Sequence, residues 1–157
     1  MRTPIRAVQF IAIALTALAM VPSAAHLMEF ANKAKLDAPS YMIVQHIYSG
    51  WAFAGVAVIG SIAANLWLAV RSRSQRPPFL LASAAFVLML GTLISFFVWI
   101  YPANVATAQW TDAPADLPPL RAAWESTHAV NGALAILAFI AVVAASLSWK
   151  DRGPDAP

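Results

Sequence analysis

The chain has 157 residues, of which 61% are hydrophobic and only 11% are charged. Soluble domains carry about 45–50% apolar and about 25% charged residues, so this composition excludes an ordinary soluble domain and indicates one domain embedded in lipid. The absence of cysteine excludes disulfides, thiolate nucleophiles, iron–sulfur clusters and cysteine-ligated zinc, and a net charge of +3 without a basic, aromatic-interleaved patch argues against nucleic acid as a partner.

Four apolar runs follow one another along the chain, at about residues 7–28, 42–70, 79–100 and 124–148. Each is long enough for the roughly 20 residues that a helix needs to cross the hydrocarbon core. Since lipid offers the backbone no hydrogen-bond partner, we expect each run to be a helix. The sequence therefore predicts an all-α, integral membrane antiparallel four-helix bundle that forms a single transmembrane domain over residues 1–157.

The first run has a second interpretation. It follows MRTPIR and reaches SAA at residues 23–25, a small-residue triplet that resembles a secretory signal cleavage site. The run is long for a signal, and candidate site residues come directly after the triplet. We therefore expect it to be the first membrane span, with a cleaved signal as the alternative.

The basic residues divide unequally between the two ends of the predicted bundle. Seven fall at the end that holds both termini and three at the other, and an excess of Lys and Arg is typical of the cytoplasmic side. We therefore place both termini in the cytoplasm and expect the loops 31–41 and 101–122 to face the periplasm or the exterior, with a bacterial inner membrane as the expected location. The seven are Arg2, Arg6, Arg71, Arg73, Arg76, Lys150 and Arg152, and the three are Lys33, Lys35 and Arg121.

Polar side chains gather toward the outer end of this predicted bundle. His26, Glu29 and Lys33 lie on one face of the first helix, because they are spaced i, i+3 and i+7. Tyr41, Gln45 and Tyr48 repeat a helical spacing in the second run, and Arg121, Glu125 and His128 in the fourth. Ionisable residues within spans usually face the interior of a bundle, so the sequence predicts one pocket at this end.

The loop 101–122 and the inner half of the bundle differ sharply in polarity. The loop holds four prolines, and a loop of this length is more often a lid or a site element than a plain linker. The inner half has almost no ionisable residue, which argues against a transporter or a channel. Asn65 is an isolated polar residue there, and we expect its hydrogen bonds to be satisfied locally.

Two kinds of chemistry fit the predicted pocket. Imidazole and carboxylate side chains are ligands of iron, copper and zinc, and Glu-x-x-His recurs in metal-binding helical bundles. A histidine close to its ordinary pKa of about 6.5 is instead suited to take a proton from an organic substrate, with Arg121 or Lys33 stabilising the resulting anion. The candidate metal ligands are His26, Glu29, Glu125 and His128.

Four segments of the sequence resemble the anthrone oxygenase-like family of small four-helix integral membrane proteins. They are AHLMEFANK (25–33), QHIYSGW (45–51), YPANVATAQW (101–110) and LRAAWESTHAVN (120–131). The family pattern has Leu-Pro where this chain has Phe30-Ala31. This departure at the end of the first helix bears on which substrate the protein takes.

The resemblance implies a membrane-embedded oxidase or oxygenase, and hence an oxidoreductase. Its substrate would be an aromatic or polyketide-like, anthrone-type small molecule that reacts with molecular oxygen, with no cofactor required by the sequence. It implies His128 as the base, supported by Glu125, and Arg121 as the group that steadies an enolate. The catalytic set is His128, Glu125, Arg121, His26, Glu29 and Lys33, and the substrate-binding set is Gln45, Tyr48, Trp51, Asn104, Trp110, Trp124 and Asn131.

Two other functions stay open at this point. The first is a metal- or haem-binding membrane protein that uses the same histidines and glutamates. The second is a non-catalytic membrane subunit that docks a partner through the 101–122 loop. The expected partners of the leading hypothesis are the aromatic substrate, oxygen and the lipid bilayer, with a homo-oligomer as a further expectation.

Overall fold

The computed structural model of the chain describes residues 4–151, so the predicted cytoplasmic residues Arg2 and Arg152 lie outside the described part. Within it there are helices and no strand, which confirms the all-α prediction. The α-helices are α1 (Ile5–Lys33), α2 (Ala38–Gln45), α3 (Ala54–Ser72), α4 (Arg76–Ser95), α5 (Tyr101–Ala106) and α6 (Leu117–Leu147).

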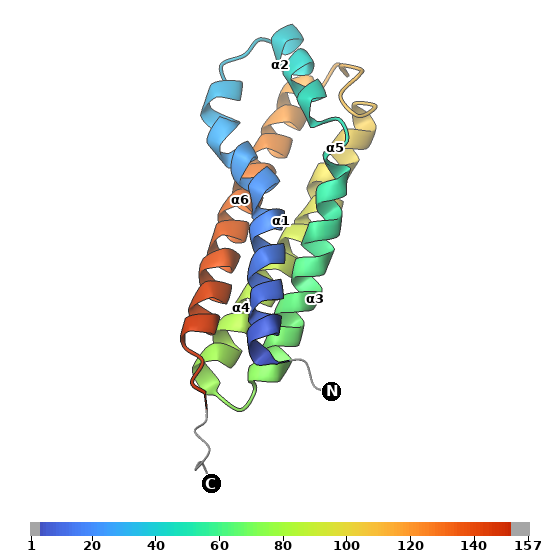
Figure 1. Cartoon of the computed structure of the whole chain (residues 1–157). Coiled ribbons are helices and arrows are strands. Elements are labelled where there is room, and N and C mark those ends of the chain that lie inside the picture. The colour runs from blue at the N-terminus through green and yellow to red at the C-terminus, as the bar shows by residue number, and fades with distance from the viewer. Residues whose placement is uncertain (1–3, 152–157) are drawn as a thin grey trace.

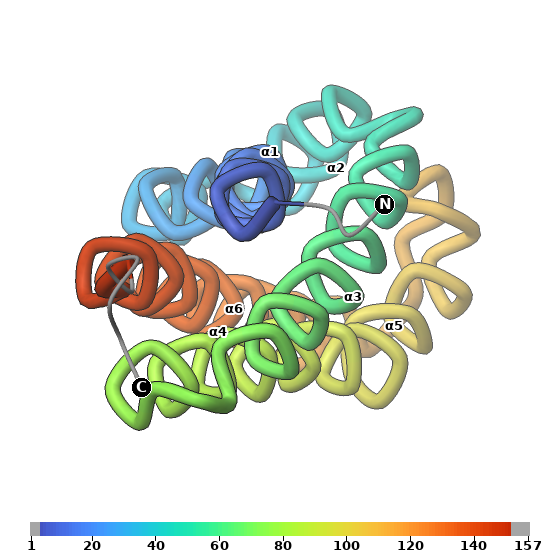
Figure 2. Tube along the Cα trace, turned by 60° about the horizontal axis from the view of Figure 1, so that its bottom comes forward, coloured from blue at the N-terminus to red at the C-terminus, as the bar shows by residue number. Residues whose placement is uncertain are grey.

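Four segments of the described chain are long and apolar enough to cross a membrane: Ile5–Lys33, Trp51–Ser72, Arg76–Ala106 and Leu117–Leu147. They pack as a ring in which α1 contacts α3 and α6, and α4 contacts the same two helices on the opposite side (Figure 2). The predicted bundle of four apolar helices is therefore confirmed.

The start of α1 and the end of α6 lie at the same end of the bundle (Figure 1). Arg6 joins them there, because its guanidinium is 2.6 Å from a carboxylate oxygen of Asp151. Gln75, just before α4, exchanges two hydrogen bonds with the backbone of Lys150. We call this the basic end of the bundle and the opposite end, where α1 terminates, the site end.

The second apolar run is not one continuous helix, which corrects the predicted span of 42–70. It is divided into α2, two 3₁₀ turns at His46–Tyr48 and Trp51–Phe53, and α3. Gly50 separates the two turns with a φ of 85°, a left-handed conformation that glycine adopts without steric cost. Asp37 caps α2 by accepting a hydrogen bond from the Ser40 N–H at 2.9 Å.

The predicted 101–122 loop is shorter than expected, because helix occupies both of its ends. A π-helical segment, Phe96–Ile100, connects α4 directly to α5, and Pro102 stands in the first turn of α5. Pro118 and Pro119 stand in the first turn of α6. Proline is tolerated in the first turn of α6 because the first N–H groups of a helix have no intrahelical partner. Pro118 and Pro119 therefore begin a helix, whereas Pro102 lies within the continuous helical segment Arg76–Ala106.

The irregular part of this loop, residues 107–116, contains three consecutive residues in the left-handed region. The φ angles are 47° at Ala108, 60° at Gln109 and 66° at Trp110. Residues with a Cβ pay about 1–2 kcal/mol for this conformation. Trp110 is buried, and its backbone N–H donates to the Thr107 hydroxyl at 3.1 Å, which keeps the turn in place.

This strain leads to a paired prediction. Gln109→Gly is expected to raise the free energy of unfolding by up to about 1 kcal/mol, because glycine adopts the left-handed region without steric cost. Gly50→Ala is expected to lower it by about the same amount, since a Cβ there meets nothing within 4 Å and only the backbone is strained. Thermal unfolding in detergent measures both. Gln109→Ala is the control, because it removes the side chain but keeps the Cβ. If the Gln109→Gly variant is no more stable than the Gln109→Ala variant, the explanation by backbone strain is wrong.

The half of the bundle toward the basic end is more polar inside than the sequence indicated. Asn65 of α3 is fully buried and donates to the Thr16 hydroxyl of α1 and to the Ser61 carbonyl, each at 2.9 Å. The predicted local hydrogen bond is present, but the second one joins two helices. The Asn65–Thr16 hydrogen bond thus joins α1 and α3, and Gln9 and Ser72 are further buried polar residues in this half.

Candidate functional site

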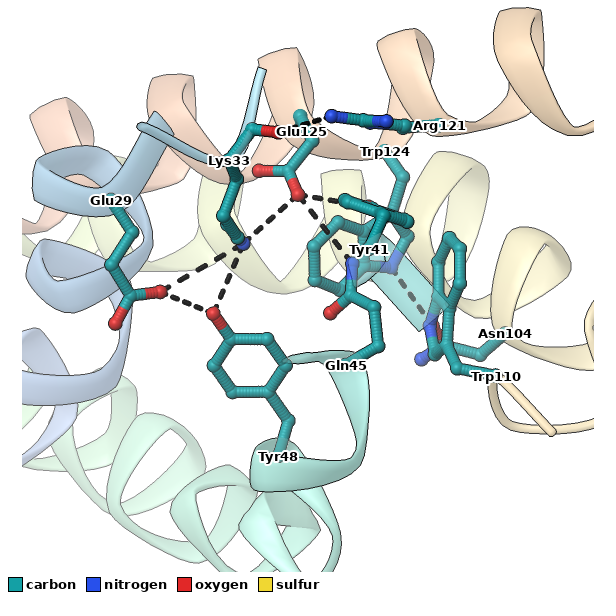
Figure 3. A network of polar contacts seen from close by, with 10 residues as sticks. All are labelled: Glu29, Lys33, Tyr41, Gln45, Tyr48, Asn104, Trp110, Arg121, Trp124 and Glu125. Carbon is teal, nitrogen blue, oxygen red and sulfur yellow. Dashed lines mark hydrogen bonds and ion pairs between the residues drawn. The ribbon is translucent and has the colours of Figure 1, made fainter. Parts of the chain in front are cut away.

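Lys33, the last residue of α1, lies at the centre of a polar cluster at the site end (Figure 3). Its side chain is directed inward and the residue is only 3% exposed. The Nζ atom is 2.9 Å from Glu125 Oε1 and 3.0 Å from the Tyr48 hydroxyl, and 3.8 Å from Glu29 Oε2. One ammonium group therefore connects α1, α6 and the turn after α2.

Glu125 of α6 is 4% exposed, so the ion pair with Lys33 is buried on both sides. Its Oε1 atom also accepts a hydrogen bond from the Tyr41 hydroxyl at 2.8 Å and a longer one from Gln45 at 3.5 Å. Its Oε2 atom is buried and has no hydrogen-bond partner within residues 4–151. The carboxylate is thus fixed through one oxygen, while the other is enclosed without a hydrogen-bond partner among the described residues.

Glu29 forms the outer part of the cluster. It accepts a hydrogen bond from the Tyr48 hydroxyl, and 41% of its side chain is exposed. The contacts from Glu125 through Lys33 and Tyr48 to Glu29 therefore form a continuous path from a buried carboxylate to the surface.

Two tyrosines complete this hydrogen-bonded cluster. Burial, followed by the negative charge of Glu125, raises the pKa of the Tyr41 phenol. Burial, followed by the hydrogen bond to Glu29, raises the pKa of the Tyr48 phenol. Both phenols therefore stay protonated at neutral pH and donate to carboxylates. Tyr41 was absent from the predicted site set, although its spacing with Gln45 and Tyr48 was a signal for it.

Next to the ionic cluster, His26 of α1 and His128 of α6 form a tilted stack, with ring centroids 4.0 Å apart and ring planes 37° from parallel. Trp124 contacts the His128 ring at 4.1 Å and Tyr48 contacts the His26 ring at 4.4 Å, while Trp51 is 5.8 Å away. The Nδ1 atom of His26 and the Nε2 atom of His128 are buried and unpartnered within the described chain. The sequence correctly grouped these two histidines, and the structure makes them a stacked pair.

Asn104 of α5 organises the aromatic wall. Its Oδ1 atom accepts hydrogen bonds from the indole N–H groups of Trp110 at 3.0 Å and Trp124 at 2.8 Å. His46 donates from Nε2 to the Trp110 carbonyl at 3.1 Å, which ties the turn after α2 to the irregular loop. Asn104, Trp110 and Trp124 therefore support the site, and His46 lies outside the stacked pair.

Arg121 and Asn131, two predicted site residues, hold helices together in this structure. Arg121 donates to the backbone carbonyls of Lys33 and of Leu36, the latter at 2.9 Å, and so caps the last turn of α1. Asn131 bonds to the Ser95 hydroxyl and the Thr92 carbonyl of α4. The cation that reaches into the cluster is therefore Lys33.

The predicted metal ligands do not converge. Among residues 4–151, no group of three or more His, Asp or Glu side chains is placed to hold a metal ion. Glu29 and Glu125 both face Lys33, whereas His26 and His128 face each other. The four side chains therefore do not share one point.

A groove of about 390 Å³ opens between the end of α1 and the segment formed by α2 and the turn after it. Its polar lining includes Lys33, Glu29 and Tyr48, so it gives access to the ionic cluster. The volume is within the range of small-molecule sites, about 300–1,000 Å³. The other lining residues are Met28, Asn32, Leu36, Val44 and Ile47.

Fold and site together define a small four-helix protein of the membrane-spanning type, with a buried ionic and aromatic cluster at one end. Comparison with known protein families, with curated proteins and with solved structures found no match to this chain.

Proposed function

We propose that the protein is a membrane-embedded oxygenase that oxidises an anthrone-type aromatic molecule with molecular oxygen. The observation that carries the proposal is the stacked histidine pair, in which each ring has a buried nitrogen without a partner, beside the buried ammonium of Lys33. A base and a cation in one buried site are what enolate formation requires.

The first step is removal of a proton from the carbon that lies para to the substrate carbonyl across its central ring. His128 accepts this proton at Nε2, while contacts with the rings of His26 and Trp124 hold its imidazole in place. Lys33 stabilises the negative charge that develops on the carbonyl oxygen. Glu125 keeps Lys33 in place through its Oε1 atom and does not contact His128 by any hydrogen bond within the described residues.

The carbanion then reduces oxygen directly. Electron transfer and recombination form a C–O bond and a hydroperoxide, and elimination of water from it leaves a second carbonyl. One anthrone and one O2 thus give one anthraquinone and one water. All electrons come from the substrate, so the protein side chains have only to bind, deprotonate and exclude water.

The proposal places this site at the outer face of a bacterial inner membrane. Arg6, Arg71, Arg73 and Arg76 lie toward the opposite end of the bundle, and the positive-inside rule puts that end in the cytoplasm. The substrate and oxygen are both lipid-soluble and so are concentrated where the site lies.

Oxygen uptake by the purified protein with an anthrone tests the function. His128→Gln is expected to lower kcat/KM by about 100-fold or more, because general bases contribute about 10²–10⁴. His46→Gln is the matched control and is expected to keep full activity. Absence of uptake at every pH between 6 and about 9, a range that spans the ordinary imidazole pKa of about 6.5, would reject the proposal. A stoichiometric metal in protein purified without chelator would favour the metal-binding alternative.

A further inference from the structure

We propose that residues 38–48, which form α2 and the turn after it, are seated in the outer lipid boundary, and that the groove beside them opens sideways into the bilayer. The site would therefore take a lipid-soluble ligand from the membrane and not from water. The statement about ligand entry rests on the proposed function, whereas the seating of the segment does not.

The first observation is that this segment has two unlike faces. Tyr41 and Gln45 point to Glu125 in the interior of the protein. Ile43 and Ile47 lie on the other face and are 72% and 67% exposed. A helix with one polar, internally bonded face and one bare aliphatic face resembles an interfacial helix, whose apolar side enters the boundary between headgroups and acyl chains.

The second observation is that the apolar face continues into the lipid-facing surface of the bundle. Met28 of α1, across the groove from Ile47, is 80% exposed, and Phe53 at the start of the next span is exposed as well. The 29 residues of α1 are about 43 Å long, whereas the hydrocarbon core is about 30 Å thick. Met28 is thus near the outer boundary of the hydrocarbon core. The exposed apolar side chains of this surface are therefore covered by lipid.

The third observation is that polar contacts fix which face is turned outward. Asp37 caps the start of α2, Tyr41 is bonded to Glu125, and His46 is bonded to the Trp110 carbonyl. Rotation of the segment would break these bonds and bury Ile43 and Ile47 beside charged groups. The apolar face is therefore held outward in the folded protein.

The groove itself indicates the class of ligand. Its rim is formed by Met28, Val44 and Ile47, and its polar side chains are Glu29, Asn32, Lys33 and Tyr48. A molecule with an apolar body and one hydrogen-bonding oxygen matches a groove that has an apolar rim and polar side chains further in. Such a molecule partitions into lipid, so a mouth that opens to the acyl chains places the site where its ligand is concentrated.

Because the chain has no cysteine, single cysteines can be introduced and labelled with bimane. The test positions are Ile47→Cys on the segment and Met28→Cys at the rim. Phe53→Cys is the lipid-facing control, and Lys35→Cys, in the exposed turn before α2, is the aqueous control. Each protein is reconstituted into phosphatidylcholine vesicles with or without brominated acyl chains, and iodide serves as the aqueous quencher.

We expect brominated lipid to quench the labels at Ile47 and Met28 as strongly as at Phe53, and iodide to quench the label at Lys35 only. Quenching of the first two labels by iodide at the level of Lys35 would overturn the proposal. Labels protected from both quenchers would also overturn it, since a second copy of the chain would then cover the face. The measurement requires no turnover, so its failure is distinct from failure of the oxygenase activity.

Discussion

Replacing Lys33 with methionine is expected to lower the free energy of unfolding by about 3–5 kcal/mol, the usual cost of leaving one partner of a buried ion pair alone. Both Lys33 and Glu125 are almost fully buried and 2.9 Å apart. Removing the ammonium leaves the carboxylate with only the neutral donors Tyr41 and Gln45. The Tyr48 hydroxyl loses a donor in the same change.

The double variant Lys33→Met/Glu125→Leu separates the ion pair from the packing of the site. It is expected to recover much of the lost stability, because apolar residues of similar volume often replace a buried pair at little cost. Lys35→Met, at an exposed position two residues on, is the control and should change little. Thermal unfolding in detergent measures all three. A single variant as stable as the original protein would show that the pair is not buried as described.

Gly132→Ala is the second substitution with a large expected effect. A Cβ at Gly132 would stand 2.6 Å from the Ser23 carbonyl oxygen and 2.8 Å from the Leu27 Cβ. Neither atom is at the free end of a flexible side chain, so α1 and α6 would have to separate. Overpacking of this kind costs about 1–3 kcal/mol or more, and it would also pull His26 away from His128.

Two other helical glycines provide controls for this variant. A Cβ at Gly55 meets nothing within 4 Å, and at Gly91 the nearest atom is the Leu134 Cδ1 at 3.9 Å. Alanine at either position is expected to leave stability unchanged or to raise it, because alanine favours helix by about 1 kcal/mol over glycine. The unfolding midpoint in detergent ranks the three variants. Similar midpoints for all of them would argue against a close α1–α6 contact at Gly132.

The four apolar helices could be predicted from the sequence because hydrophobic length alone decides that property. The internal boundaries of the helices could not. Gly50 breaks the second run because the chain has to turn there to bring Tyr41 and Gln45 over Glu125. A proline has the same local signal whether it lies in a loop, within a continuous helical segment as Pro102 does, or at a helix start as Pro118 does, so the sequence alone did not distinguish these cases.

Part of the candidate site could also be predicted, since helical spacing places residues on one face. His26 and Lys33 of α1, and Glu125 and His128 of α6, were grouped in this way and do meet at the site end. Spacing within one helix carries no information about which side chain on the next helix is its partner. The predicted pairing of Glu125 with His128 is for that reason replaced in the structure by a pairing with Lys33.

The sequence by itself thus determined that the protein has four helices apolar enough to cross a membrane, and at which end of the bundle its polar residues gather. Both follow from hydropathy and periodicity, which are local properties. Only the tertiary structure decided that Lys33, and not Arg121, is the cation inside the cluster. Both are basic residues at helix ends and are alike in sequence. The register of α1 against α6 brings one ammonium to a buried carboxylate and leaves the guanidinium to cap α1, and that register depends on contacts such as Gly132 on Ser23.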